Sequence, residues 1–288
     1  NEPENWAKTK TIMEFEDWLN WKLTGRKTVS MSVAAFRWNY DDKNGGYPVD
    51  FYNAVGLDDV VDKFPEPVLK VGEVVGNISA EAAEIFGLSK KTVVVEGTAD
   101  CNACMFGVGG VRPNGMTLIG GTSTCLLGLS EEEFHVDGVN GTYPNCMYDG
   151  TSLLEGGQTA AGSILTWFKN NLLPAAWMQE AVNRNMNIYD LITEKASAVP
   201  IGCDGLVMMD YFQGNRAPYA DSKARGMFWG LSNGTTPAHL ARAVYEGVAY
   251  GANHCIVSMK KAGYDVKEQY KHVLGQNGIP IYRLYPSL

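Results

Sequence analysis

Apolar residues recur every three to four positions along two stretches of the chain, which is the pattern of a helix with one buried face. The first stretch runs from Ile12 to Leu23, and Gly25 follows it as a residue that favours a helix end. The second runs from His239 to Gly263 and is preceded by Pro237, a residue suited to the first helical turn. The pattern therefore predicts two amphipathic helices, of which the second is the longer.

A β-branched run from Thr92 to Val95 predicts a buried strand that ends before Gly97 and delivers Asp100 to its carboxyl end. Ligands bind at that end of the strands in open α/β sheets. The small residues after Asp100 predict a short helix that stops near Gly107. Asp100 is therefore a candidate catalytic base, and helix capping is its structural alternative.

A second strand is expected from Met116 to Ile119, and it leads into the turn Gly120-Gly121-Thr122-Ser123-Thr124. Glycines let backbone amides approach an anion closely, and three hydroxyls line this turn. The same residues also suit the tip of a β-hairpin. A carboxylate and an anion-binding turn so close in sequence suggest the transfer of a phosphoryl group to a hydroxyl.

The stretch that begins with Glu155 predicts a helix that runs to Asn171, with small residues in its first turns. Either close helix packing or a flat ligand would explain those small residues. A further buried strand is expected from Asp204 to Tyr211. The turn that follows contains Arg216 and Asp221, and we expect these two side chains to pair with each other.

Composition and charge narrow the possible classes of function. The chain has 288 residues, of which 45% are hydrophobic and 19% charged, so it can form one large core or two smaller domains. The net charge is −8 and no basic stripe is present, which argues against nucleic acid and anionic membranes as partners. No apolar run is long enough to span a bilayer.

Six cysteines are scattered along the chain, which fits thiols in a reducing compartment and predicts a cytoplasmic protein. The pair Cys101-x-x-Cys104 is also compatible with a redox or zinc module. It lacks a second cysteine or histidine pair at metal-binding spacing, so a metal site is not expected.

Four motifs follow one another in a specific order: Gly97-Thr-Ala-Asp100, Gly120 to Cys125 (GGTSTC), Glu155 to Gly162 (EGGQTAAG) and Gly214 to Pro218 (GNRAP). In this order they resemble the FGGY family of carbohydrate kinases over nearly the whole chain. The second and third motifs are most similar to those of the ribulokinases. This resemblance implies an α/β fold of the actin-like ATPase (ribonuclease H-like) type, with two domains and the active site in the cleft.

The resemblance also implies a domain division. Residues 1–100 correspond to the C-terminal part of the family's first domain, and residues 101–288 correspond to most of the second. The family's Asp-x-Gly-Thr phosphate loop has no counterpart in this sequence. We therefore expect the sequence to be a fragment that by itself binds nucleotide poorly and turns over little or no substrate.

ATP and Mg²⁺ are the cofactors that the resemblance implies. Asp100 corresponds to the catalytic base, and Glu155 and Arg37 correspond to residues of the sugar pocket. Gly275 lies in a loop that matches the family's adenine loop only in part. The residues implied for the phosphates and the nucleotide are Gly121, Thr122, Gly162, Thr166 and Gly275.

The reaction that the resemblance implies is ATP-dependent phosphorylation of a small-molecule sugar, with the ketopentose ribulose as the first candidate. Xylulose, erythritol and glycerol are alternative substrates within the same family. A catalytically silent sugar-binding relative is the alternative from a different class of function. The resemblance leaves a homodimer open.

Overall fold

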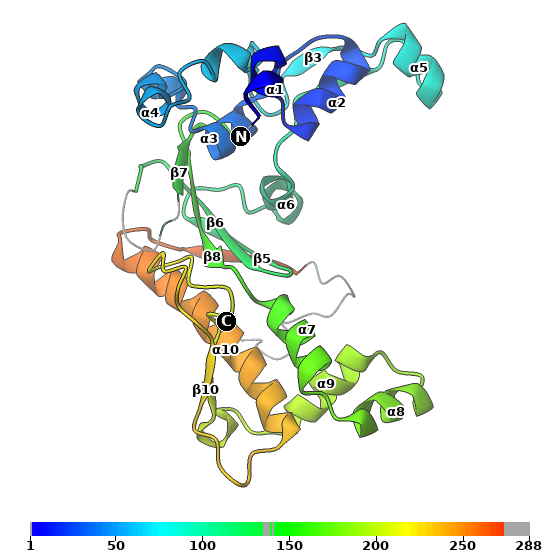
Figure 1. Ribbon diagram of the computed structural model, residues 1–288, viewed down its shortest axis with the longest axis vertical. Helices are drawn as coiled ribbons and strands as arrows, with labels where there is room; N and C mark the ends of the chain where they lie inside the picture. Colours follow the sequence, from blue (N-terminus) through cyan, green and yellow to red (C-terminus); the bar gives the residue numbers. More distant parts are fainter. Residues whose placement is uncertain (1, 135–138, 140, 274–288) are drawn as a thin grey trace. The chain divides into compact units, whose positions relative to one another are not determined.

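The computed structural model describes residues 2–134, 139 and 141–273 (Figure 1). The chain divides into two compact units. We call residues 1–106, 129–133 and 142–153 the first unit, and residues 107–128, 134–141 and 154–288 the second unit.

The first unit consists of short helices and two small sheets. The predicted helix after Ile12 begins at Phe15, and Gly25 ends it in the left-handed conformation, with a φ of 78°. Another helix of this unit ends at Gly87 and is capped at its start, where the Ser79 hydroxyl accepts a hydrogen bond from the Ala82 amide at 3.1 Å. The elements are α1 (Pro3–Lys8), α2 (Phe15–Thr24), β1 (Val29–Ser30), α3 (Met31–Trp38), α4 (Val49–Ala54), β2 (Val68–Leu69), β3 (Val74–Asn77), α5 (Ala80–Phe86), β4 (Val93–Val95) and α6 (Asp100–Val108), with short 3₁₀ helices at Asp42–Asn44 and Val61–Lys63.

The strand predicted before Asp100 forms as β4, but the expectation that it is buried was wrong. Val93 and Val95 are each 50% exposed. In the described part of the chain, β4 pairs only with β3, and the pairing is antiparallel. β-branched residues favour an extended backbone, whereas burial depends on which elements pack against the strand, and that is not encoded in the run itself.

Carboxyl groups gather in the interior of the first unit. Asp17 and Glu96 are each 1% exposed. The Ser30 amide donates to Asp17 at 2.9 Å, and the Asn20 side chain donates to Glu96 at 2.7 Å. Burial raises the pKa of Asp17 to about 7, and burial together with the charges of Glu96 and Asp17 raises the pKa of Glu16 to about 7.

The second unit is built on a five-stranded sheet with the order β11-β5-β6-β8-β7. Strand β11 runs parallel to β5, and β5 runs antiparallel to β6. Strands β6, β7 and β8 extend past the limits of this unit along the chain, and residues 142–144 of β7 are counted in the first unit. The elements are β5 (Gly115–Gly120), β6 (Thr124–Ser130), β7 (Gly141–Pro144), β8 (Ser152–Gln158), α7 (Gly162–Asn171), α8 (Ala175–Asn183), α9 (Ile188–Ser197), β9 (Val207–Met209), β10 (Met227–Trp229), α10 (Pro237–Lys261) and β11 (Glu268–Val273), with a 3₁₀ helix at Cys203–Gly205.

The main core of the second unit forms where α7, α9 and β9 pack around α10, the long helix predicted from the sequence (Figure 1). Its buried apolar side chains include Phe168, Ile192, Met208 and Val244. Gly247 allows the helix to approach β9, because a Cβ at this position would lie 2.5 Å from the Met208 carbonyl oxygen. The close approach predicts that larger residues are excluded from this position.

The helix expected to begin at Glu155 begins later, and this prediction was wrong. Residues 155–158 belong to strand β8, every residue of which is buried. Gly157 has a φ of 146°, and a Cβ there would collide with the carbonyl oxygen of Thr124 on β6. Gly157 thus serves the close approach of two strands, and the helical segment is limited to Gly162–Asn171.

Two further results concern the sequence predictions. The strand expected from Asp204 to Tyr211 is confirmed only at Val207–Met209. Within the described residues, no helix is both long enough and apolar enough to cross a membrane.

The buried carboxyls predict that the first unit becomes less stable as the pH rises from about 4 to about 7. The folded state holds protons on Glu16 and Asp17 at pH values where the unfolded chain has released them, so this contribution is full at low pH and is lost as the folded groups ionise. Asp17→Asn keeps an acceptor for the Ser30 amide and removes one titrating group, so it should reduce the pH dependence.

Urea unfolding of both proteins at pH 5 and pH 8, with hydrogen exchange in α2 as the local probe, measures this effect. The control is Asp50→Asn, which changes an exposed carboxyl on α4 and should leave the difference between the two pH values as it is. An equal difference in wild type and Asp17→Asn would contradict the assignment.

Candidate active site

The glycine and hydroxyl motif at residues 120–124 forms the tip of the β5–β6 hairpin, as one of its two interpretations predicted. Gly120 pairs with Thr124 across the hairpin, and the Gly121 amide donates to the Ser123 carbonyl at 2.8 Å. The Gly121 amide is therefore engaged within the turn. Thr122 and Ser123 are exposed at the tip, so their hydroxyls are accessible to an anion.

Three backbone hydrogen bonds hold the hairpin tip against the start of α7. The Gly162 amide donates to the Gly121 carbonyl at 3.0 Å. The Thr122 carbonyl accepts from the amides of Ala161 at 3.0 Å and Ser163 at 3.1 Å. A Cβ on Gly162 would lie 2.5 Å from the Gly121 oxygen, so only glycine fits there without a shift. The structure thus brings together Gly121, Thr122 and Gly162, which are far apart in the sequence.

Of the two remaining residues predicted to contact the nucleotide, Thr166 lies within the described part of the chain and Gly275 does not. Thr166 lies one turn further along α7 and is exposed, and its hydroxyl is 3.3 Å from the hydroxyl of Tyr189 on α9. Gly275 lies outside the described residues. Within the second unit, the predicted nucleotide-binding residues that the structure describes therefore lie at the hairpin tip and in the first turns of α7.

Glu155 lies within β8 and is 2% exposed. Its Oε1 atom lies 2.5 Å from Nη2 of Arg216, which reaches it from the loop after β9. The expected pairing of Arg216 with Asp221 was wrong. Asp221 instead accepts hydrogen bonds from the backbone amides of Lys223 and Ala224.

The Glu155–Arg216 contact is the residue pair that the sequence analysis missed. A buried carboxylate is costly unless it is paired, and removing one partner of such a pair typically destabilises a protein by about 3–5 kcal/mol. Cys125 on β6 adds a weak sulfur donor, 3.9 Å from the same Oε1 atom. The signal available in the sequence was the Arg within the Gly-Asn-Arg-x-Pro motif, but its partner could be identified only from the structure.

Asp100 opens α6 and is exposed. Its Oδ1 atom accepts a hydrogen bond from the Cys101 amide at 2.7 Å. Two residues further on, the fully buried Asn102 donates to the Ser32 hydroxyl at 3.0 Å, and Ser32 also contacts Thr98. These contacts anchor the start of α6 to the start of α3, so Asp100 extends from a fixed helix terminus.

Arg37 belongs to the last turn of α3 and is exposed. Helix α3 carries both Arg37 and Ser32, and Ser32 is hydrogen-bonded to α6, the helix that begins with Asp100. The predicted sugar-pocket arginine and the predicted base therefore lie on two helices that contact each other in the first unit. The redox or zinc hypothesis receives no support at Cys104, which is a thiol whose pKa is raised by burial and by the nearby charge of Asp100. Among the described residues, no group of three or more His, Cys, Asp or Glu could hold a metal ion.

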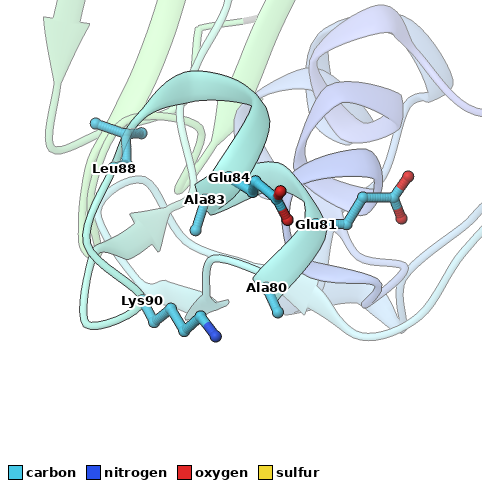
Figure 2. A pocket seen from close by; sticks show the side chains of 6 residues that line it. All are labelled: Ala80, Glu81, Ala83, Glu84, Leu88 and Lys90. Carbon is cyan, nitrogen blue, oxygen red and sulfur yellow. The ribbon is translucent and has the colours of Figure 1, made fainter.

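Two surface hollows lie apart from these residues. One, of about 560 Å³, lies in the first unit against α5 and the segment that follows it (Figure 2). The other, of about 180 Å³, lies in the second unit between β9 and α10 and includes Asp210 and His254. Neither is lined by a predicted site residue. The first is lined by Ala80, Glu81, Ala83, Glu84, Leu88 and Lys90.

Comparison with known protein families identifies the family of this chain. The C-terminal domain of the FGGY family of carbohydrate kinases matches residues 116–285, and the N-terminal domain of the same family matches residues 1–107. The chain belongs to the FGGY family of carbohydrate kinases. The resemblance deduced from the four motifs is therefore confirmed.

Individual relatives support the same assignment. Ribulokinase 2 of Staphylococcus saprophyticus is 32% identical over 281 residues, which are 96% of this chain and 51% of that protein. A ribulokinase of Staphylococcus aureus is 33% identical over 252 residues, which are 86% of this chain and 46% of that protein. The chain spans about half the length of the curated relatives it matches.

A solved structure confirms the predicted fold class. The xylulose kinase from Rhodospirillum rubrum superposes with a TM-score of 0.80 at 27% identity, and the match covers 98% of this chain and 54% of that one. The α/β fold of the FGGY sugar kinases, of the actin-like ATPase type, is thus the fold of this chain.

The packing of the hairpin against α7 predicts the effect of Gly162→Ala. The added Cβ would meet the Gly121 carbonyl oxygen at 2.5 Å, so α7 or the hairpin must shift, and overpacking of this kind destabilises by about 1–3 kcal/mol. Unfolding by urea measures the loss. Ser163→Ala is a neighbouring control, because the buried Ser163 hydroxyl has no hydrogen-bond partner among the described residues, and its removal should change stability by less than about 0.5 kcal/mol.

Proposed function

We propose that the protein containing this chain transfers a phosphoryl group from ATP to a hydroxyl of a ketopentose, with ribulose as the preferred substrate. The observation that carries the choice of substrate is the identity of 32% to Ribulokinase 2 over 96% of this chain. The geometry supports the reaction class, because an accessible carboxylate and an exposed hydroxyl-rich turn are both held by fixed elements.

Asp100 acts as the general base in this proposal. A sugar hydroxyl is a weak nucleophile near neutral pH, and a carboxylate within hydrogen-bond reach accepts its proton as the oxygen bonds to phosphorus. Support comes from the exposure of Asp100 at the first turn of α6 and from the Asn102–Ser32 contact that anchors that turn. A group on a rigid helix terminus loses little entropy when it takes up a productive position.

The hairpin tip and α7 contact ATP in the same proposal. Thr122 offers an exposed hydroxyl to the phosphate oxygens, and Gly162 and Thr166 lie toward the nucleotide. The Gly121 residue contributes through its lack of a side chain rather than through its amide, which already bonds to Ser123. Mg²⁺, when bound with ATP, neutralises charge on the β- and γ-phosphate oxygens.

We propose that residues 1–100 are the end of the family's first domain, with Arg37 on the sugar side, and that residues 101–288 are most of the second. Glu155 is the other residue that the resemblance assigns to the sugar pocket. Because Glu155 is 2% exposed and paired with Arg216, it acts in this proposal through Arg216 and not by direct contact with a ligand.

Xylulose is the second candidate substrate. The observation in its favour is the structural match to a xylulose kinase, with a TM-score of 0.80 and 27% identity. Both candidates are ketopentoses, so the reaction and the role of Asp100 are the same for each. A panel of D-ribulose, L-ribulose, D-xylulose and glycerol separates them.

Asp100→Asn in the full-length protein should lower kcat by about 10²- to 10⁴-fold, because the amide cannot accept the hydroxyl proton. Coupled measurement of ATP consumption over the four-substrate panel provides the rate. Glu81→Gln, which neutralises a carboxylate on the surface of α5 (Figure 2), is the matched control and should retain wild-type activity. Full activity of Asp100→Asn would refute the role of Asp100, and a panel without any signal would refute the substrate class.

A further inference from the structure

The Glu155–Arg216 pair is unequal in exposure. The Glu155 side chain is 3% exposed, whereas the Arg216 side chain is 44% exposed. A ligand at this surface therefore meets the guanidinium first, and the carboxylate lies beneath it. An arginine carries five N–H donors in a fixed plane and remains charged at all working pH values.

The pair lies beside the β5–β6 hairpin within the second unit. Oε1 of Glu155 contacts the sulfur of Cys125, which directly follows the hairpin tip. Two residues beyond Glu155, Gly157 packs against the Thr124 carbonyl on the same hairpin. The carboxylate that anchors the guanidinium thus contacts the hairpin at Cys125, three positions after Thr122, whose side chain is exposed.

The loop that carries Arg216 is held firmly on both sides. Asn215 is 8% exposed, its amide side chain donates to the Ala217 carbonyl at 3.0 Å, and its side-chain oxygen accepts from the Tyr219 amide at 2.8 Å. The Asn215 backbone amide donates to the Asp221 carbonyl at 2.8 Å. A binding group is most effective when its neighbours fix it in this way before the ligand arrives.

We propose that Arg216 binds the phosphoryl group during its transfer and that Glu155 is the positioning residue that holds Arg216 in place. This inference rests on the proposed kinase function. In the step, the sugar oxygen forms a bond to the γ-phosphorus, the bond from that phosphorus to the oxygen of ADP breaks, and the hydroxyl proton passes to Asp100. Arg216 donates hydrogen bonds to the phosphoryl oxygens, where negative charge is concentrated.

Kinetics of Arg216→Met, Arg216→Lys and Glu155→Gln in the full-length protein test the proposal. Arg216→Met should lower kcat by about 100-fold or more, with the KM for the sugar changed by less than about threefold, because a group that acts on the transferring phosphoryl affects the transition state more than sugar binding. Arg216→Lys should restore part of kcat, since it retains a point charge.

Glu155→Gln leaves the charge of Arg216 in place but weakens its anchor, so kcat should fall less than in Arg216→Met. The double variant Arg216→Met with Glu155→Gln should be no slower than Arg216→Met alone. It also removes both charges of the pair and so leaves no unpaired buried carboxylate, which keeps the phosphate-binding test valid if Arg216→Met does not fold. A rise in KM for Glu155→Gln that adds to the effect of Arg216→Met would overturn the positioning role, and an unchanged kcat in Arg216→Met would overturn the binding role.

A binding measurement separates this proposal from the proposed function. Inorganic phosphate should raise the melting temperature of the full-length wild-type protein and of its Arg216→Lys variant, and it should have no such effect on Arg216→Met or the double variant. If the substrate panel gives no signal while this pattern holds, the kinase assignment fails and the anion site at Arg216 stands. If the panel is active and phosphate protects all variants equally, the proposal for Arg216 is wrong.

Discussion

The backbone contact between the hairpin tip and the start of α7 is the constraint on which the second unit's candidate site depends. Three amides of residues 161–163 donate to the carbonyl groups of Gly121 and Thr122. Backbone groups at a helix start otherwise need side-chain caps or water, so this contact satisfies the helix and fixes the hairpin at once. The absence of a side chain at Gly162 is what permits it.

Much of the architecture could be predicted from local signals. Gly25 marks a helix end and Pro237 a helix start as expected, because their conformational preferences act within a few residues. The order of the four motifs was sufficient to identify the family. The same local logic failed at Glu155, where glycines that suggested the start of a helix serve the contact between two strands.

The candidate site was predictable only as a set of separate residues. Gly121, Thr122 and Gly162 were each identified, yet their hydrogen bonding depends on a contact between distant segments. Arg216 was assigned the wrong partner because Asp221 is near it in sequence, whereas Glu155 is separated from it by 61 positions. The exposure of β4 was likewise not predictable, because a β-branched run does not specify which elements pack against the strand.

Strand β8 has a further consequence for how the chain finds its register. All seven residues from Ser152 to Gln158 are buried, so the usual alternation of covered and solvent-facing positions gives no preference between neighbouring registers. A slip of one residue would place Leu154 or Gly156 opposite Arg216 and would move Gly157 away from Thr124. The ion pair and the missing side chain thus distinguish the correct alignment of a strand whose hydrophobicity alone leaves it ambiguous.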